Sequence, residues 1–360
     1  MRRLQVKSSA VEYQVIVGRG AWRALRQLKG YTTAFVLTEP GLWKRWGKKF
    51  ASDAGWQGVR PILVPSGEGS KSLSMAGRVA SELLDRGADR KSLLVALGGG
   101  VVGDLGGFVA STYMRGIDYA QAPTTVLAQV DSSIGGKTAV NIHAMKNLVG
   151  TFYAPRVVVS DPEVLASLQP RAFKSGLYEA VKHCILSGPE LFKWLEGKVS
   201  GLKPGDAGVL ETLVARAAAV KVDVVTRDER EAALRRVLNL GHTYGHALEE
   251  ATGYRRFLHG EAVAWGMLMV TRLAELAGVL DPADGKRIAH LVRAVGPLPN
   301  LRNLKAEKVL GLLIRDKKAV GGKIHWVLPE GIGRVRVAAD VPDAIVARAF
   351  HDVQGGVWND

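Results

Sequence analysis

Three histidines lie close together in the second half of this 360-residue sequence. His242 and His246 are four positions apart, so on a helix they share one face, which is the spacing of two-histidine metal sites. His259 or a carboxylate could supply a third ligand. Three nitrogen or oxygen ligands with an open coordination position suit catalytic zinc, and iron or cobalt would also fit. The cluster therefore indicates a metal site or an acid–base site.

A second polar group lies inside an apolar helix predicted from about residue 173 to 186. Glu179 and Lys182 are three positions apart, and as a solvated pair they would contribute only about 0.2–0.5 kcal/mol. Leu177 and Ile185 belong to the apolar surroundings, so the carboxylate could instead be buried and require a cation. The residues alone leave both interpretations open.

A glycine-rich turn, residues 98–104, follows an apolar strand-like run at 92–97 and precedes a helix-like stretch. Glycines allow backbone amides to approach a pyrophosphate, and the following helix N-terminus favours anions. The turn at 66–71 adds a glutamate that could accept ribose hydroxyls. The context favours dinucleotide binding, whereas the alternative is a tight turn that needs glycine only for its backbone angles.

Polar side chains are concentrated between Arg115 and Asn147, next to a glycine pair. Lysines such as Lys137 and Lys146 are natural ligands of phosphate or carboxylate groups. This composition is typical of a loop that surrounds a small, oxygen-rich anion. For any single lysine, a solvated surface position is the alternative.

The elements that must position these groups change type along the chain. Up to about residue 160, β-branched runs such as 34–37 and 61–64 alternate with helix-like segments, which predicts an α/β domain with a parallel sheet. After Pro170, apolar residues such as Leu210, Leu213 and Ala217 recur at helical spacing. We therefore expect two domains, residues 1–168 and 169–360, of which the second is helical.

Composition limits the classes of protein that remain. The chain holds 49 Lys and Arg against 34 Asp and Glu, a formal charge of +15 that favours anionic partners, whether phosphorylated metabolites or nucleic acid. Cys184 is the single cysteine, and the basic start of the chain runs into polar sequence rather than a secretory signal. The longest apolar run, Ala262 to Val270, is shorter than the roughly 20 residues of a membrane span. We expect a cytoplasmic protein with no membrane partner.

These residues together resemble the 3-dehydroquinate synthase family of sugar-phosphate cyclases. The resemblance covers about residues 60–335, and five ordered blocks carry it: residues 98–115, 123–137, 179–182, 238–246 and 258–261. It implies an N-terminal Rossmann-like NAD-binding domain followed by an all-helical C-terminal domain, with the active site in the cleft between them. It also implies a homodimer.

The resemblance assigns the cofactor residues by position. It implies that Glu179, His242 and His259 bind one divalent metal, zinc or alternatively cobalt, so that His246 serves the substrate and proton transfer. The implied NAD contacts are Glu68, Lys71, Gly99, Gly100, Val101, Asp104, Thr124 and Thr125. His183, one turn after Glu179, could compete as a ligand, although we favour a role in which it contacts a ligand and not the metal.

The remaining implied residues bind or transform the substrate. The implied catalytic residues are Asp131, Lys137, Lys182, Lys221, Arg235, Asn239 and His246, and the implied substrate contacts are Arg115, Lys146, Asn147 and Lys317. Many members carry glycine where this chain has Met145, which leaves the geometry of the following Lys–Asn pair open.

The implied substrate is 3-deoxy-D-arabino-heptulosonate 7-phosphate, whose carboxylate and phosphate match the lysines and arginines. NAD would oxidise C5 transiently, phosphate would leave, and an aldol closure would give 3-dehydroquinate with no net NADH. The alternatives are a metal-dependent polyol or glycerol-phosphate dehydrogenase and another sugar-phosphate cyclase. Outside enzymes, a basic nucleic-acid-binding protein would leave the histidines and the glycine-rich turn unexplained, so we expect no nucleic-acid partner.

Overall fold

The computed structural model describes residues 1–8, 11–143, 145–231, 233–319 and 323–358, with the side chains of 316–319 left out. The chain forms two compact units, Met1–Leu168 with Lys203–Arg230, and Gln169–Leu202 with Glu231–Asp360. The change of unit after residue 168 lies where we expected a boundary. The return of residues 203–230 to the first unit differs from that division, and its reason is the packing of one helix described below.

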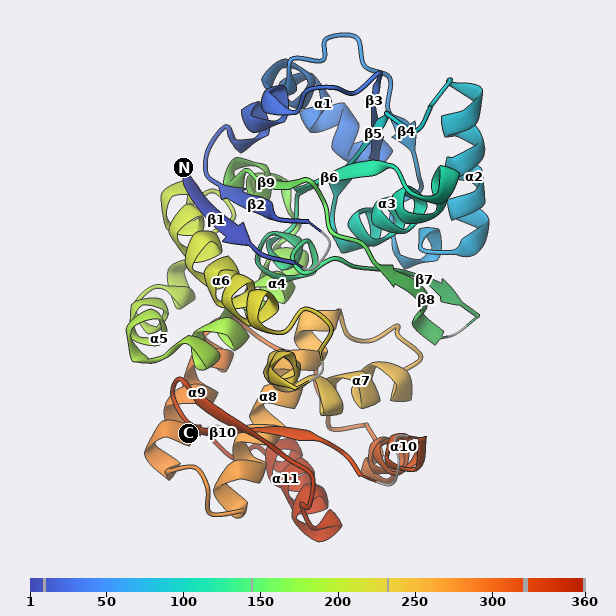
Figure 1. The fold of residues 1–360 in the computed structure, drawn as a ribbon. Helices are drawn as coiled ribbons and strands as arrows, with labels where there is room; N and C mark the ends of the chain where they lie inside the picture. The colour runs from blue at the N-terminus through green and yellow to red at the C-terminus, as the bar shows by residue number, and fades with distance from the viewer. Residues whose placement is uncertain (9–10, 144, 232, 320–322, 359–360) are drawn as a thin grey trace. The chain divides into compact units, whose positions relative to one another are not determined.

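The first unit is built on a seven-stranded sheet with the order β1-β2-β9-β6-β5-β3-β4 (Figure 1). Its strands are β1 (Arg2–Val6), β2 (Tyr13–Val17), β3 (Ala34–Thr38), β4 (Ile62–Leu63), β5 (Leu93–Gly98), β6 (Asp118–Pro123) and β9 (Val157–Ser160). Only β1 runs antiparallel to its neighbour β2, and the other pairs are parallel. Central strands such as β5 are buried throughout, as expected for a parallel sheet covered by helices. The predicted α/β fold with a parallel sheet is confirmed.

Among the described residues, four α-helices belong to the same unit as this sheet. They are α1 (Pro40–Ala54), α2 (Leu73–Asp85), α3 (Gly100–Thr112) and α6 (Ala207–Arg227). Helix α6 packs against β1, β2 and the π-helical turn Ala128–Ser132, and it buries Leu213, Ala217 and Lys221. Those contacts place residues 203–230 in the first unit. A separate hairpin, β7 (Lys137–Ile142) and β8 (Met145–Phe152), packs on α3.

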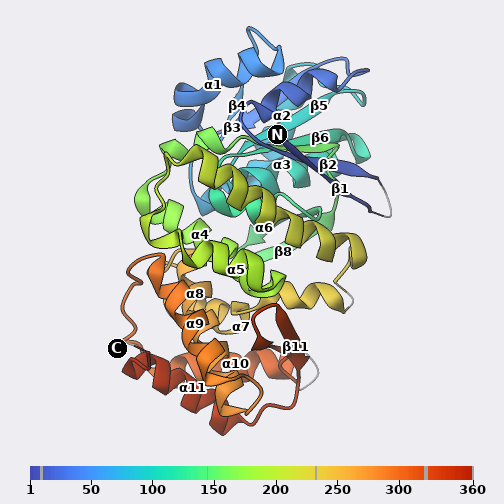
Figure 2. The same cartoon turned by 90° about the vertical axis from the view of Figure 1, so that its left-hand side faces the viewer.

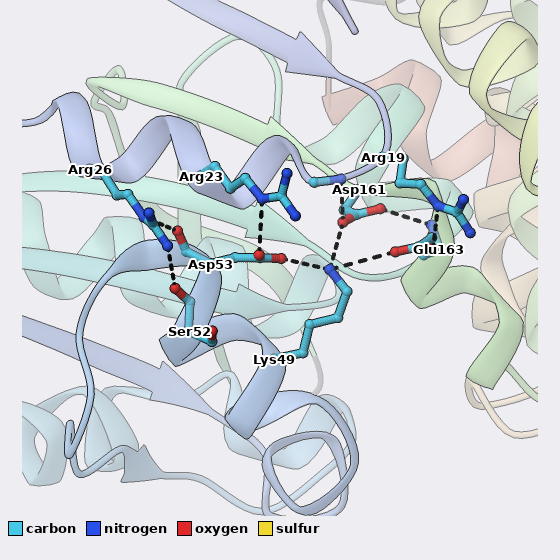
Figure 3. Close-up of polar contacts among 9 residues, drawn as sticks. Arg19, Arg23, Arg26, Lys49, Ser52, Asp53, Asp161 and Glu163 are labelled. Carbon is cyan, nitrogen blue, oxygen red and sulfur yellow. Dashed lines mark hydrogen bonds and ion pairs between the residues drawn. The ribbon is translucent and has the colours of Figure 1, made fainter.

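A charged network joins the start of the first unit to its sheet (Figure 3). Lys49 Nζ lies 2.6 Å from Asp53, 3.5 Å from Glu163 and 3.6 Å from the buried Asp161. Asp161 also accepts a 2.9 Å hydrogen bond from the backbone N–H of Gly20. Arg23 pairs with Asp53 and Arg19 pairs with Glu163, so three cations together offset the three carboxylates and reduce the cost of burying Asp161 beside the end of β9.

The second unit is mainly helical. Its helices are α4 (Pro170–Ser187), α5 (Pro189–Glu196), α7 (His242–Ala251), α8 (His259–Leu276), α9 (Pro282–Ala294), α10 (Ala306–Ala319) and α11 (Asp343–Gly355). Helix α8 is buried along most of its length and packs against α4, α7, α9 and α11 (Figure 2). The unit also contains an antiparallel hairpin, β10 (Trp326–Gly331) with β11 (Arg334–Ala338), so it is helix-rich rather than all-helical. Trp326 is 2% exposed and its ring lies 4.9 Å from that of Tyr244 at a tilt of 46°, so this strand packs into the core.

In the described part of the chain, every helix is too short or too polar to cross a membrane.

Candidate functional site

Three side chains from three helices of the second unit converge on one point. Glu179 of α4 places Oε1 3.4 Å from Nε2 of His259 in α8 and 3.8 Å from Nε2 of His242 in α7. One ligand atom from each of the three lies within 4.8 Å of the other two. The geometry therefore selects the glutamate as the partner of these two histidines, rather than the i, i+4 pair alone.

Two glycines of α8 allow the three helices to approach so closely. A Cβ atom on Gly260 would lie 1.8 Å from the backbone oxygen of Ser175 in α4. A Cβ atom on Gly266 would lie 1.8 Å from the backbone oxygen of Gly241, which immediately precedes α7. Any larger residue would therefore separate α8 from the helices that carry the other two converging side chains.

The Glu179 carboxylate is buried and charged partners surround it. Its exposure is 1%, and Oε2 lies 2.6 Å from Nζ of Lys182, whose side chain is also 1% exposed. This finding decides between the two interpretations of the pair, because a solvated stripe would expose both groups. Burial lowers the pKa of His242, and the positive charge of Lys182 lowers it further.

His259 has two carboxylate neighbours. Burial alone would lower its pKa, but hydrogen bonds with Glu179 and Glu249 outweigh that effect and raise it to about 10. Glu249 Oε2 lies 3.2 Å from Nδ1 of His259, and its side chain is 3% exposed. Glu249 was not predicted as a site residue, although its position three residues after His246 on α7 was a usable signal.

The donor set fits a divalent cation. One carboxylate oxygen and two imidazole nitrogens match the ligand preferences of zinc and related metals. Among the described residues a second candidate set combines His246, Glu249 and His259. His183 belongs to neither set, although it is fully buried in α4.

In the first unit, the predicted dinucleotide-binding turn lies where the neighbouring strands β5 and β6 end. Gly98 pairs with Pro123 at the carboxyl ends of β5 and β6, and the N–H of Thr124 donates to the Gly98 oxygen over 2.9 Å. A Cβ atom on Gly99 would meet the Thr125 side chain at 3.1 Å. The predicted residues Gly99, Gly100, Val101, Thr124 and Thr125 therefore lie together, at the N-terminus of α3. Ligands of parallel α/β sheets bind at this kind of edge.

Lys71 connects the turn after β4 to this edge. It is 5% exposed, and its ammonium contacts the Asp104 carboxylate and the Asn147 side-chain oxygen. Burial raises the pKa of Asp104, and the Lys71 charge partly offsets that rise. Glu68 accepts a 2.8 Å hydrogen bond from Asn141, whose own side-chain oxygen accepts the backbone N–H of Asn147 over 2.9 Å.

The structure also describes the backbone around Met145, the position where many family members carry glycine. Met145 is 60% exposed and begins β8, so its side chain does not displace the residues that follow it. Asn147 has a φ of 56°, a left-handed conformation that asparagine tolerates. Lys146 lies between them, half-buried.

The π-helical turn after β6 carries the predicted Asp131. Its carboxylate contacts the ammonium of Lys221, which also donates to the Asp131 backbone oxygen over 2.7 Å. Gln129, fully buried, donates from Nε2 to the backbone oxygens of Pro123 and Asp161 at 3.0 and 2.9 Å. These bonds hold the turn against the ends of β6 and β9, a role that sequence reasoning missed.

The other predicted residues are distributed over both units. In the first unit Arg115 is exposed and has a φ of 69°, and Lys137 is exposed at the start of β7. In the second unit Arg235 is 3% exposed, and Asn239 donates to Glu231 over 2.8 Å. The exposed His246 has its ring 5.5 Å from His242 and 6.0 Å from His259. The side chain of Lys317 lies outside the described residues.

Comparison with known proteins gives one family for the whole chain. The family models described as 3-dehydroquinate synthase N-terminal and C-terminal match residues 61–175 and 176–319. A protein of Koribacter versatilis named 3-dehydroquinate synthase is 44% identical over 361 residues, which cover 98% of each chain.

Solved structures of two other synthases share the fold. A 2-deoxy-scyllo-inosose synthase, solved with carbaglucose-6-phosphate, NAD+ and Co2+, has a TM-score of 0.86 and 25% identity, covering 98% of this chain and 99% of its own. The 2-epi-5-epi-valiolone synthase of Streptomyces hygroscopicus subsp. jinggangensis, solved with NAD+ and Zn2+, has a TM-score of 0.86 and 28% identity, covering 99% of each chain.

Proposed function

Because the chain belongs to the 3-dehydroquinate synthase family, we propose that it converts 3-deoxy-D-arabino-heptulosonate 7-phosphate to 3-dehydroquinate and phosphate. The convergence of Glu179, His242 and His259 on one point carries this proposal in the structure. When bound, a divalent cation would stabilise negative charge on a substrate oxygen, and NAD would accept and return a hydride.

We propose Glu179, His242 and His259 as the ligands of the cation, zinc or cobalt. The buried carboxylate supports this assignment, since a divalent ion would compensate the negative charge of Glu179 in a site that is removed from water. His259→Ala is expected to lose the metal in the purified protein. Stoichiometric metal in that variant would contradict the assignment.

For NAD we propose the edge formed by β5, β6 and the N-terminus of α3. The glycines leave backbone N–H groups open to a pyrophosphate, and the helix N-terminus favours its charge. Support comes from the close packing of Gly99 on Thr125 and from the Lys71–Asp104 contact beside the turn. The remaining proposed contacts are Glu68, Gly100, Val101 and Thr124.

Positively charged side chains would hold the two anionic ends of the substrate. Lys137 and Lys146 of the hairpin, with Arg115, are donors suited to phosphate or carboxylate oxygens. The further proposed donors are Asn147, Lys182, Lys221, Arg235, Asn239 and Lys317. A substrate with both a carboxylate and a phosphate would use such a donor-rich set better than an uncharged polyol.

Two groups are suited to proton handling. The His246 imidazole is exposed beside the two proposed histidine ligands, a position suited to the exchange of a proton with the substrate. The Asp131 carboxylate contacts the ammonium of Lys221, which fixes its orientation. We propose that these two side chains move protons on the substrate.

The test is an incubation of purified protein with NAD and the heptulosonate phosphate, in which inorganic phosphate and NADH are measured together. Phosphate release without lasting NADH is expected. Stoichiometric NADH without phosphate would indicate a metal-dependent dehydrogenase instead. Turnover of sugar phosphates that lack a carboxylate, but not of the heptulosonate, would indicate another sugar-phosphate cyclase.

We further propose that the protein is a cytoplasmic homodimer, as the family resemblance implies. Light scattering after size-exclusion chromatography is expected to give twice the 38.7 kDa chain mass.

A further inference from the structure

Glu249 is a buried carboxylate that the proposed mechanism does not use. It lies on α7 with its side chain 3% exposed, and with His242 and His246 it forms an i, i+4, i+7 series on one helix face. Its Oε2 lies 3.2 Å from Nδ1 of His259. Since an ionised carboxylate only accepts hydrogen bonds, the imidazole donates its Nδ1–H to Glu249.

The two nitrogens of the His259 ring therefore face different carboxylates. Nε2 lies 3.4 Å from Glu179, on the side of the proposed ligands, while Nδ1 lies against Glu249. Once Nε2 loses its proton to make way for a metal ion, a ring held in this way directs the Nε2 lone pair to the side of the proposed ligands, and it cannot turn without breaking the buried contact. Metal-bound histidines commonly donate their other N–H to a carboxylate, which fixes the tautomer and raises the basicity of the ligand nitrogen.

We propose that Glu249 is a positioning residue for the divalent cation, which orients His259 and does not itself bind the metal. The inference rests on the proposed function. The competing arrangement uses His246, Glu249 and His259 as ligands. It is disfavoured because His246 is exposed, whereas Glu179 is 1% exposed and a cation bound between Glu179, His242 and His259 would compensate that buried charge.

The test measures Zn2+ and Co2+ affinity by competition with a chelator, in the metal-free protein reloaded with each ion. Glu249→Ala is expected to bind about 10–100-fold more weakly than the original chain. Glu249→Gln keeps the volume and an acceptor oxygen, so its loss is expected to be smaller. The neighbouring Glu250→Gln serves as the matched control, because Glu250 lies on the same helix but pairs with Arg315 of α10. The metal affinity of this variant should be unchanged.

Ligand variants separate positioning from coordination. Glu179→Gln is expected to weaken metal binding more than Glu249→Ala does. The visible spectrum of Co2+ bound to Glu249→Gln should match that of the original chain, because the coordination geometry is expected to be unchanged. The proposal is overturned if both Glu249 variants bind within twofold of the original chain. It is also overturned if Glu249→Ala and His246→Ala abolish binding while Glu179→Gln retains it.

Two measurements keep the result interpretable. Thermal unfolding of the metal-free variants identifies a folding defect, and Glu249→Gln carries the test if Glu249→Ala unfolds. Phosphate release by the original chain tests the proposed function separately. Unaltered metal affinity in the Glu249 variants of an active enzyme would therefore contradict this inference and leave the proposed function standing.

Discussion

Lys182 and Glu179 form a buried ion pair within a single helix, with Nζ 2.6 Å from Oε2 and both side chains 1% exposed. The two residues are one turn apart on α4, so the helix itself presents the charges to each other. Because both are removed from water, loss of one partner leaves a charge that the protein interior solvates poorly.

Replacement of this lysine should therefore destabilise the protein in a metal-dependent way. Lys182→Met is expected to lower the free energy of unfolding of the metal-free protein by about 3–5 kcal/mol. Saturating Zn2+ should recover part of the loss, because the cation compensates Glu179. Urea unfolding with and without Zn2+ measures both effects, and the double variant with Glu179→Gln should recover stability without metal. A Lys182→Met protein as stable as the original chain would show that the pair is not needed.

The close contact of α8 with α7 gives a prediction about geometry. Gly266→Ala would place a methyl group against the Gly241 backbone oxygen, and the helices must separate to admit it. Overpacking of this kind costs about 1–3 kcal/mol, and the movement would also displace the proposed ligands. We expect a lower Tm and weaker Co2+ binding. Gly311→Ala in the exposed part of α10, where a methyl group meets open space, should leave metal affinity unchanged.

Lys137 allows substrate binding to be separated from cofactor binding. Lys137→Ala removes a charged donor that is worth about 1.5–3 kcal/mol, so kcat/KM should fall by roughly 10–100-fold. NAD affinity, followed by titration calorimetry, is expected to stay within twofold. Lys44→Ala, an exposed lysine of α1, is the control for a change in overall charge. A parallel loss of NAD affinity in Lys137→Ala would contradict the assignment.

The network around Lys49 predicts how stability depends on pH. Burial raises the pKa of Asp53, but hydrogen bonds from Lys49 and Arg23 outweigh it and lower the pKa below its ordinary value (Figure 3). A lowered pKa in the folded state contributes stability above the unfolded value of about 3.9, and this stability is lost as pH falls through the folded value. Asp53→Asn should therefore cost about 1.5–3 kcal/mol at pH 7.

The cost of Asp53→Asn should then shrink as the solution is acidified below about pH 4. Urea unfolding of both proteins at several pH values measures this difference. A difference that stays constant from pH 7 to pH 2 would show that the carboxylate charge of Asp53 is not what the network stabilises.

Much of this architecture could be predicted from the sequence because it depends on local patterns. Apolar β-branched runs indicated the parallel strands, and the glycine-rich turn at 98–104 indicated a strand end opening into a helix. The predicted helices after Pro170 were confirmed. The hairpin that begins at Trp326 was not predicted, because a short strand is identified by its partner strand rather than by its own periodicity.

The tertiary structure decided what depends on contact between distant segments. Sequence spacing placed His242 and His246 on one helix face, yet two other helices, α4 and α8, bring Glu179 and His259 to His242. The packing alone showed that Lys182 is buried and that Glu249 contacts His259. The physical reason is that periodicity determines which face of a helix a side chain occupies. The glycine contacts of α8, by contrast, determine which other helices that face meets.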